Sequence, residues 1–346
     1  MNGMKGIISC IMTAIVLMGT LTACGSVSGV TAAEGDNIRI VTTIFPEYDW
    51  VMNVLGENPA NAEVTMLLDN GVDMHSYQPT ADDILRVSAC DLFIYVGGES
   101  DAWANDALQE SMNKDKVVIN LMDVLGDSVK EEEIVEGMQA EEHEGAEGGV
   151  TDAGAGEPEV KAGSEEETEY DEHVWLSLRN AATCVRSISD AMGDVDPDNA
   201  DFYRDNASEY VDKLKSLDDE YEAMIRDSSC HTLLFGDRFP FRYLTDDYGL
   251  DYYAAFAGCY AEAEASFETI VFLSNKADEL SLGSILTIEG TDHRIAEAIR
   301  DNTASGDQQI LTLNSMQSAT LEDASNGTSY LSVMTNNLSV LTEALR

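Results

Sequence analysis

The sequence predicts an α/β protein of two lobes with mainly parallel sheets, joined by a long rigid helix. Two observations predict this class. Short β-branched runs alternate with amphipathic stretches in both halves of the 346-residue chain, and a long helical pattern separates the halves. Strands and helices that alternate in this way are typical of α/β folds with parallel sheets. A chain of this length has room for about two domains, each with its own core.

The elements follow from the local patterns. In the first half, the expected strands are 38–45, 64–68, 92–97 and 117–121, and the expected helices are 81–88 and 102–112. Two further helices, 178–192 and 198–225, precede the second half. In the second half, the expected strands are 232–235, 252–256, 284–288 and 309–313, and the expected helices are 267–280, 294–300 and 328–345.

Five segments are expected along the chain. They are a signal peptide (1–23), a tether (24–37), a first lobe (38–193), a linking helix (194–226) and a second lobe (227–346). The linking helix has apolar and tyrosine side chains at intervals of three to four residues after Pro197. At about 1.5 Å per residue it would be about 42 Å long, enough to span two lobes as a stiff connector.

The first lobe contains an acidic stretch over 127–172. It has 18 Asp and Glu against 2 Lys, and few large apolar residues. Burial of so few apolar groups cannot offset the entropy lost on ordering, so we expect a disordered loop. His143 in this loop has two interpretations, a transient catcher of metal or a solvated residue in a charge run.

The N-terminus has the pattern of a secretory signal. Residues 1–23 contain no Asp or Glu, and their apolar run is too short to span a membrane comfortably. The run ends in Leu21-Thr22-Ala23-Cys24, which resembles a bacterial lipobox. That resemblance implies cleavage before Cys24, acylation of its thiol, and anchoring of the protein to the membrane outside the cytoplasm.

Charge and cysteine content exclude some classes. The chain carries 65 Asp and Glu against 19 Lys and Arg, a formal net charge of −46, which disfavours nucleic-acid binding because phosphates would be repelled. Beyond the signal and Cys24, four cysteines remain without CxxC spacing, so a cysteine-based zinc site is not expected. Burial of Cys90, Cys184, Cys230 and Cys259, or one disulfide among them, stays open.

Two of the five histidines lie where chemistry is expected. His75 follows the strand 64–68, and His173 follows the acidic stretch. Glu289 and Asp237 follow strands of the second half. Ligands of α/β sheets bind beyond the carboxyl ends of the strands, which is where such residues would lie. Two imidazoles with carboxylates suit Zn²⁺ and tolerate Mn²⁺, so we expect a metal site in the cleft between the lobes.

Several motifs resemble one family along residues 38–346. "DMHSYQPTADDI" (73–84) and "DEHVWLSLRNA" (171–181) resemble the two histidine motifs of the zinc/manganese solute-binding lipoproteins of ABC importers, the ZnuA/AdcA-like family. The linking-helix sequence (194–221), "FGDRFPFRYLTDDYGL" (235–250), "AEAEAS" (261–266) and "ILTIEGTDHRIAEAI" (285–299) are also similar to that family.

The resemblance implies a function and a ligand set. His75 and His173 would be the first-lobe ligands and Glu289 a second-lobe ligand. Family members place His or Glu directly after the strand, where this chain has Gly236. Asp237 is the expected substitute, with Asp292, His293 or water as alternatives.

The implied protein is a monomer that captures Zn²⁺, or alternatively Mn²⁺, for a membrane permease driven by an ATPase. A metal-dependent surface hydrolase would use similar ligands with an open water position. An adhesin-like surface lipoprotein would hold a structural metal. The sequence has no His-Glu-x-x-His, Gly-x-Ser-x-Gly or P-loop motif, and we expect no enzymatic activity.

Overall fold

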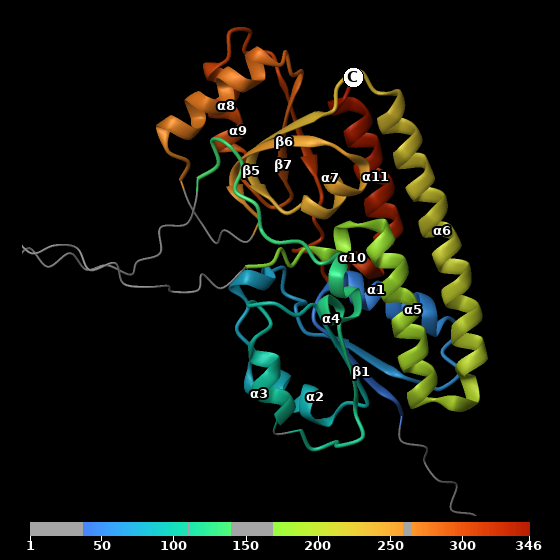
Figure 1. Cartoon of the computed structure of the whole chain (residues 1–346). Helices are drawn as coiled ribbons and strands as arrows, with labels where there is room; N and C mark the ends of the chain where they lie inside the picture. Colours follow the sequence, from blue (N-terminus) through green and yellow to red (C-terminus); the bar gives the residue numbers. More distant parts are fainter. Residues whose placement is uncertain (1–36, 110, 140–168, 259–263) are drawn as a thin grey trace, which may run out of the picture. The chain divides into compact units, whose positions relative to one another are not determined.

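Two four-stranded parallel sheets organise the protein. Figure 1 shows β1 of the first sheet and β5, β6 and β7 of the second in different halves of the fold. In this computed structural model, the described residues are 37–109, 111–139, 169–258 and 264–346, and residues 37–346 form one compact unit. The first sheet has the order β2-β1-β3-β4, and the second has the order β6-β5-β7-β8. Every neighbouring pair of strands in both sheets is parallel, which confirms the expected fold class. We call each sheet with its own helices a lobe.

The strands of the first lobe are β1 (Arg39–Thr42), β2 (Glu63–Met66), β3 (Leu92–Tyr95) and β4 (Val117–Asn120). The second lobe has β5 (Thr232–Phe239), β6 (Asp251–Ala257), β7 (Ser284–Ile288) and β8 (Gln309–Leu313). The helices are α1 (Phe45–Leu55), α2 (Ala81–Ala89), α3 (Trp103–Gln109), α4 (Leu121–Leu125), α5 (Leu178–Val195), α6 (Ala200–Asp227), α7 (Arg242–Tyr248), α8 (Phe267–Glu279), α9 (Arg294–Asn302), α10 (Leu321–Ser325) and α11 (Tyr330–Ala344).

Most strand ends lie within two residues of the sequence-based expectation, and two differ by more. The first strand was expected to continue to residue 45, but β1 ends at Thr42 and α1 begins at Phe45. The Glu47 carboxylate accepts hydrogen bonds from the backbone N–H groups of Thr43 and Ile44, and this local bonding starts the helix. Conversely, β5 continues four residues past the expected end at residue 235, with a bulge between Phe235 and Arg238.

The expected acidic loop is ordered at both of its ends. Backbone bonds attach Gln139 to Ala255 of β6 (2.9 Å) and Asp171 to Lys130 (2.9 Å), and Asp171 is buried. Backbone pairing, which composition does not reveal, holds 127–139 and 169–172 against the rest of the fold. His143, Cys259, Cys24 and the expected signal peptide lie outside the described residues. Within the described ranges, no helix combines the length and apolarity needed to cross a membrane.

Helix α6 joins the lobes along its length. It contacts α1 and α5 of the first lobe and α7 and α11 near the second, and Figure 1 shows it running along one side of both lobes. Its buried tyrosines make the connection specific. The Tyr210 hydroxyl donates to Asp49 of α1 (3.0 Å), and the Tyr221 hydroxyl donates to the backbone oxygen of Met334 in α11 (2.6 Å). One helix is therefore bonded to both halves of the fold.

The larger of two hydrophobic clusters extends across both lobes, and the smaller one lies within the second lobe around Leu234, Leu273 and Ile285. Trp175 and Tyr330 belong to the larger cluster, and both are fully buried. Tyr330 donates to the backbone oxygen of Trp175 (2.7 Å), while the Trp175 indole donates to the backbone oxygen of Ser315 (2.8 Å). The segment that contains Trp175 is thereby fixed from the second lobe as well as from the first.

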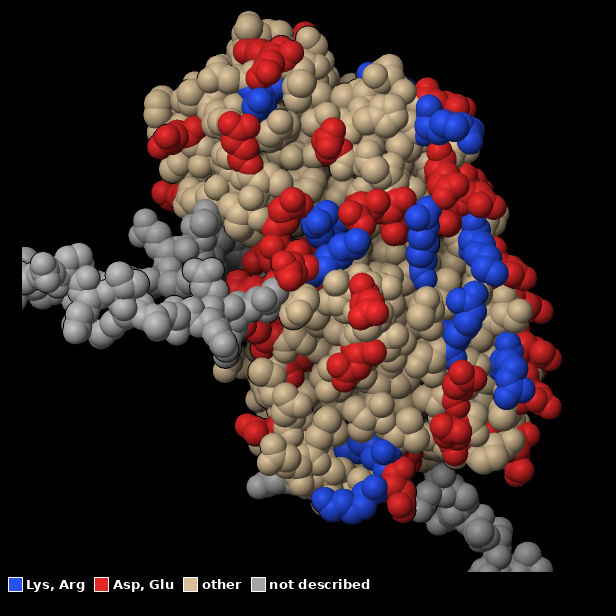
Figure 2. Space-filling model, viewed as in Figure 1, with Lys and Arg blue, Asp and Glu red and all other residues tan. Residues whose placement is uncertain are grey.

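Charged side chains are scattered over the visible surface, and the basic ones form no continuous patch there. On the face in Figure 2, the Lys and Arg side chains of the described residues lie among Asp and Glu. Arg179 of α5, for example, pairs with Asp218 and Glu222 of α6. The described cysteines Cys90, Cys184 and Cys230 are free thiols.

We expect Tyr221→Phe to lower the free energy of unfolding by about 1 kcal/mol, since it removes a buried hydrogen bond between α6 and α11. Urea denaturation of the purified protein measures the change. Tyr170→Phe is the matched control, because Tyr170 is 47% exposed. Equal losses in the two variants would contradict this account of the linking helix.

Candidate metal centre

His75 lies in a short 3₁₀ turn (Met74–Ser76) that follows β2. The Asp73 carboxylate caps this turn by accepting the backbone N–H of His75 (3.0 Å). The imidazole Nδ1 lies 2.8 Å from Ser100 Oγ and 3.5 Å from Glu172 Oε2. Both partners of Nδ1 are oxygens, whereas Nε2, the other ring nitrogen, faces His173.

His173 lies at the start of a second 3₁₀ turn (Val174–Leu176) and is fully buried. Asp171 Oδ1 accepts its backbone N–H (2.8 Å) and contacts its Nδ1 (2.9 Å). The ring packs against Trp175, with 5.3 Å between the ring centroids. On another side lies Gly258, where an added Cβ would come within 3.0 Å of the imidazole Cε1. The position and rotation of this ring are therefore fixed by its surroundings.

The two imidazoles face each other through their Nε2 atoms, which are 3.1 Å apart. Two nitrogens that bind one Zn²⁺ at about 2.0–2.1 Å in tetrahedral geometry are about 3.3 Å apart. The observed separation is close to this value. Because the Nδ1 atoms face oxygens, the tautomers with Nδ1–H leave the Nε2 lone pairs available for a metal. Carboxylates that orient ligating imidazoles in this way are typical of protein metal sites.

The surroundings shift the pKa values of the two rings in opposite directions. Burial lowers the pKa of His75, and the neighbouring His173 and Arg238 lower it further. Burial also opposes charge on His173, but the Asp171 carboxylate outweighs it and raises the pKa of that ring. Burial raises the pKa of the Glu172 carboxyl, which lies beside His75. His75 is thus held neutral, as a metal ligand must be.

Glu289 follows β7, as expected, but its carboxylate is bonded to the loop after β8. Oε2 accepts the backbone N–H of Ser315 (2.7 Å). Oε1 accepts the Ser315 hydroxyl (2.8 Å) and the backbone N–H of Gln317 (3.1 Å). In this arrangement Glu289 holds the loop 314–317 in place.

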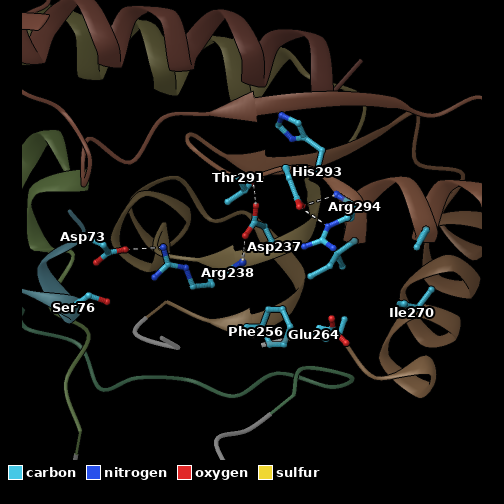
Figure 3. A pocket seen from close by; sticks show the side chains of 15 residues that line it. Asp73, Ser76, Asp237, Arg238, Phe256, Glu264, Ile270, Thr291, His293 and Arg294 are labelled. Atoms are coloured by element: carbon cyan, nitrogen blue, oxygen red, sulfur yellow. Dashed lines mark hydrogen bonds and ion pairs between the residues drawn. The ribbon is translucent and has the colours of Figure 1, made fainter. Parts of the chain in front are cut away.

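Asp237 is likewise bonded to its own lobe. Its Oδ2 accepts the backbone N–H of Ile288 (3.2 Å) and the Thr291 hydroxyl (2.8 Å), a contact drawn in Figure 3. Gly236 packs so closely on α9 that an added Cβ would lie 2.6 Å from the Cα of Ala296. The position expected from the family pattern to hold a ligand therefore has no room for a side chain.

The alternative second-lobe candidates also have other partners. His293 Nδ1 lies 2.9 Å from Thr287 Oγ1, and Asp292 pairs with Arg294. Over the described ranges, no group of three or more His, Cys, Asp and Glu side chains is arranged to hold a metal ion. The structure brings His75 and His173 together and leaves the second-lobe candidates outside that pair.

Sequence reasoning missed Arg238 and the part played by Asp73. The bulge in β5 aims Arg238 at the first lobe, where its Nη2 lies 2.7 Å from Asp73 Oδ2 (Figure 3). Asp73 belongs to the first histidine motif, so its position two residues before His75 was a usable signal. A cavity of about 770 Å³ adjoins the pair and is lined by both residues together with Ser76, Asp237, Phe256 and Thr291 among others.

Curated relatives cover most of the chain. It is 26% identical to the zinc-binding protein AdcA of Streptococcus pyogenes over 314 residues, 89% of this chain and 56% of that protein. The chain thus spans little more than half the length of AdcA. It is also 26% identical to the high-affinity zinc uptake system protein ZnuA of Bacillus subtilis over 327 residues, 94% of this chain and 93% of that protein.

A solved structure and a family model also match most of this chain. The crystal structure of the Zn(II)-bound ZnuA-like domain of Streptococcus pneumoniae AdcA matches with a TM-score of 0.66 and 25% identity, over 89% of this chain and 99% of that one. The model of the family described as zinc-uptake complex component A, periplasmic, matches residues 40–344. Since that match spans nearly the whole described fold, the chain belongs to this family.

Proposed function

We propose that this protein captures Zn²⁺ outside the cytoplasm and delivers it to a membrane permease driven by an ATPase. The observation that carries the proposal is the pair of Nε2 atoms, 3.1 Å apart, of His75 and His173. Each ring is oriented by oxygen acceptors at its Nδ1, so two lone pairs converge on one point. Imidazole is a preferred ligand of Zn²⁺, whereas Mn²⁺, the alternative substrate, favours carboxylate and water ligands.

The relatives support capture and delivery over catalysis. The names of the two relatives compared above describe zinc binding and zinc uptake. AdcA of Streptococcus pneumoniae is named a zinc-binding lipoprotein, which agrees with an anchor at Cys24 in this chain. We therefore propose a lipid-anchored, monomeric binding protein without enzymatic activity.

Glu289 and Asp237 remain the proposed second-lobe ligands. To reach the metal, each carboxylate would have to give up hydrogen bonds to backbone N–H groups within its own lobe. Such bonds to a carboxylate are charge-assisted and are about twice as strong as neutral ones. The loss of these hydrogen bonds is a free-energy cost that the two histidines do not have, because their Nε2 atoms already face each other.

We expect His75→Ala and His173→Ala each to weaken zinc binding by more than about a hundredfold, because loss of an outer partner alone typically costs about 10–100-fold. Competitive titration of the purified protein with a zinc chelator dye measures the affinity. His231→Ala is the matched control, since His231 is exposed at the start of β5. His143→Ala should also leave the affinity nearly unchanged. Equal losses in all four variants would refute the assignment of the site.

Because Glu289 and Asp237 are proposed as ligands, we expect Glu289→Gln and Asp237→Asn each to weaken zinc binding by about tenfold or more. The loss should stay below that of His75→Ala, because each carboxylate must first give up hydrogen bonds within its own lobe, and the thermal midpoint should also fall. Calorimetry and the same titration give the two quantities. A lower thermal midpoint with unchanged zinc affinity would show that the residue supports its loop and does not bind the metal.

Zinc affinity should fall by about tenfold per pH unit below the raised pKa of His173, because a proton on Nε2 competes with the metal. Asp171 raises that pKa, so in Asp171→Asn the zinc affinity should begin to fall at a lower pH than in the unmodified protein. The variant should also bind zinc more weakly at neutral pH. Titrations over a range of pH measure the onset, with the exposed Asp251→Asn as control. An unchanged or higher onset in Asp171→Asn would contradict the role of Asp171.

A further inference from the structure

Asp73 lies where three segments of the fold meet at the histidine pair. Its carboxylate accepts the backbone N–H of His75 (3.0 Å) from its own lobe. From the second lobe it receives the Arg238 guanidinium (2.7 Å). In the amide orientation that satisfies its neighbours, Gln317 also donates to both Asp73 oxygens (2.9 Å). This carboxylate is the point where the two lobes are bonded beside the metal site.

The same carboxylate is close to the position of a metal ligand. Asp73 Oδ1 lies 3.9 Å from His75 Nε2, the atom that faces His173. Two ligands of one tetrahedral Zn²⁺ lie about 3.4 Å apart. A shift of roughly half an ångström would bring Oδ1 to this ligand-to-ligand spacing from His75 Nε2. Neither Glu289 nor Asp237 has a comparable contact with the histidines.

Arg238 occupies the second-lobe side of this site and cannot bind a metal. Its guanidinium has only N–H donors and stays protonated at every physiological pH. The β5 bulge, in which Gly236 and Asp237 lie between the paired residues Phe235 and Arg238, directs this side chain across the cleft. Bulges near functional sites commonly re-aim a side chain in this way. Both Arg238 and Asp73 are about one-fifth exposed, so water screens their ion pair only in part.

We propose that Asp73 is a metal ligand of this protein and that Arg238 competes with the metal for its carboxylate. The inference rests on the proposed function and deepens it. In the empty site, Arg238 neutralises Asp73 and bonds the lobes together. When Zn²⁺ binds between His75 and His173, Asp73 Oδ1 turns to the metal and Arg238 moves into the adjoining cavity, which Asp237 and Glu264 also line. On release, the return of Arg238 to Asp73 helps to displace the ion.

A double-mutant cycle on the full-length protein tests this competition. We expect Arg238→Gln to raise zinc affinity by at least about tenfold, since it removes a positive charge that pairs with a ligand. We expect Asp73→Asn, which keeps an oxygen to accept the His75 N–H, to lower it by at least about tenfold. In the Asp73→Asn background, Arg238→Gln should change the affinity by less than about threefold, because the shared partner is gone.

Arg294→Gln is the matched control. Arg294 lines the same cavity but pairs with Asp292, so its replacement should change zinc affinity by less than about threefold. Unchanged or lower affinity in Arg238→Gln would overturn the inference, as would an equal gain with and without Asp73, which would show a general charge effect. Either result leaves the proposed function intact, provided that the unmodified protein binds one zinc ion and that His75→Ala abolishes this binding. Absence of zinc binding in the unmodified protein would refute both.

Discussion

The close approach of two buried imidazoles is the constraint on which the rest of the site depends. Two rings with Nε2 atoms 3.1 Å apart cannot both carry a proton there without repulsion in a poorly solvated place. The fold meets this constraint by giving each Nδ1 an oxygen partner, Asp171 for His173 and Ser100 for His75. Gly98 and Gly258 are required because any side chain there would collide with Glu172 or His173.

This geometry depends on both lobes. The His173 segment continues into Trp175, which Ser315 and Tyr330 bond from the second lobe. Ser315 is held in turn by Glu289. The carboxylate that the family resemblance marks as a ligand therefore also supports the frame that positions His173. Replacing Glu289 would therefore disturb the position of His173 as well as remove a proposed metal ligand.

The sequence predicted the architecture well because periodicity and burial determine it. The strands expected at 284–288 and 309–313 match β7 and β8, and the helical pattern before the second half matches α6 within about two residues at each end. Family motifs located His75 and His173, which the structure brings together. Helix α1 was not predicted at all. Apolar residues continue past β1, so the strand was expected to reach residue 45, and only the Glu47 side-chain bonds show where the strand ends.

The environment of the carboxylates could not be predicted in the same way. Glu289 bonds to residues 26 and 28 positions away, and such partners follow from how loops meet in space rather than from a local pattern. Arg238 was missed because the strand was expected to end at residue 235. A bulge changes which side chain points into the cleft without changing the hydrophobic pattern of the strand.

For the proposed capture of zinc, discrimination among metal ions has to come from the site itself, because the whole chain carries a net charge of −46. Such a field concentrates every cation, including Mg²⁺ and Ca²⁺, so it cannot discriminate among them. Hard cations need carboxylate or carbonyl oxygens, and the Asp73 oxygens are already engaged by Arg238 and Gln317. An ion that gains little from imidazole has no means of offsetting the loss of that ion pair. A first-row ion that binds both His75 and His173 gains enough from the two nitrogens to offset that loss. The proposed pairing of Arg238 with Asp73 would therefore favour ions that prefer nitrogen ligands.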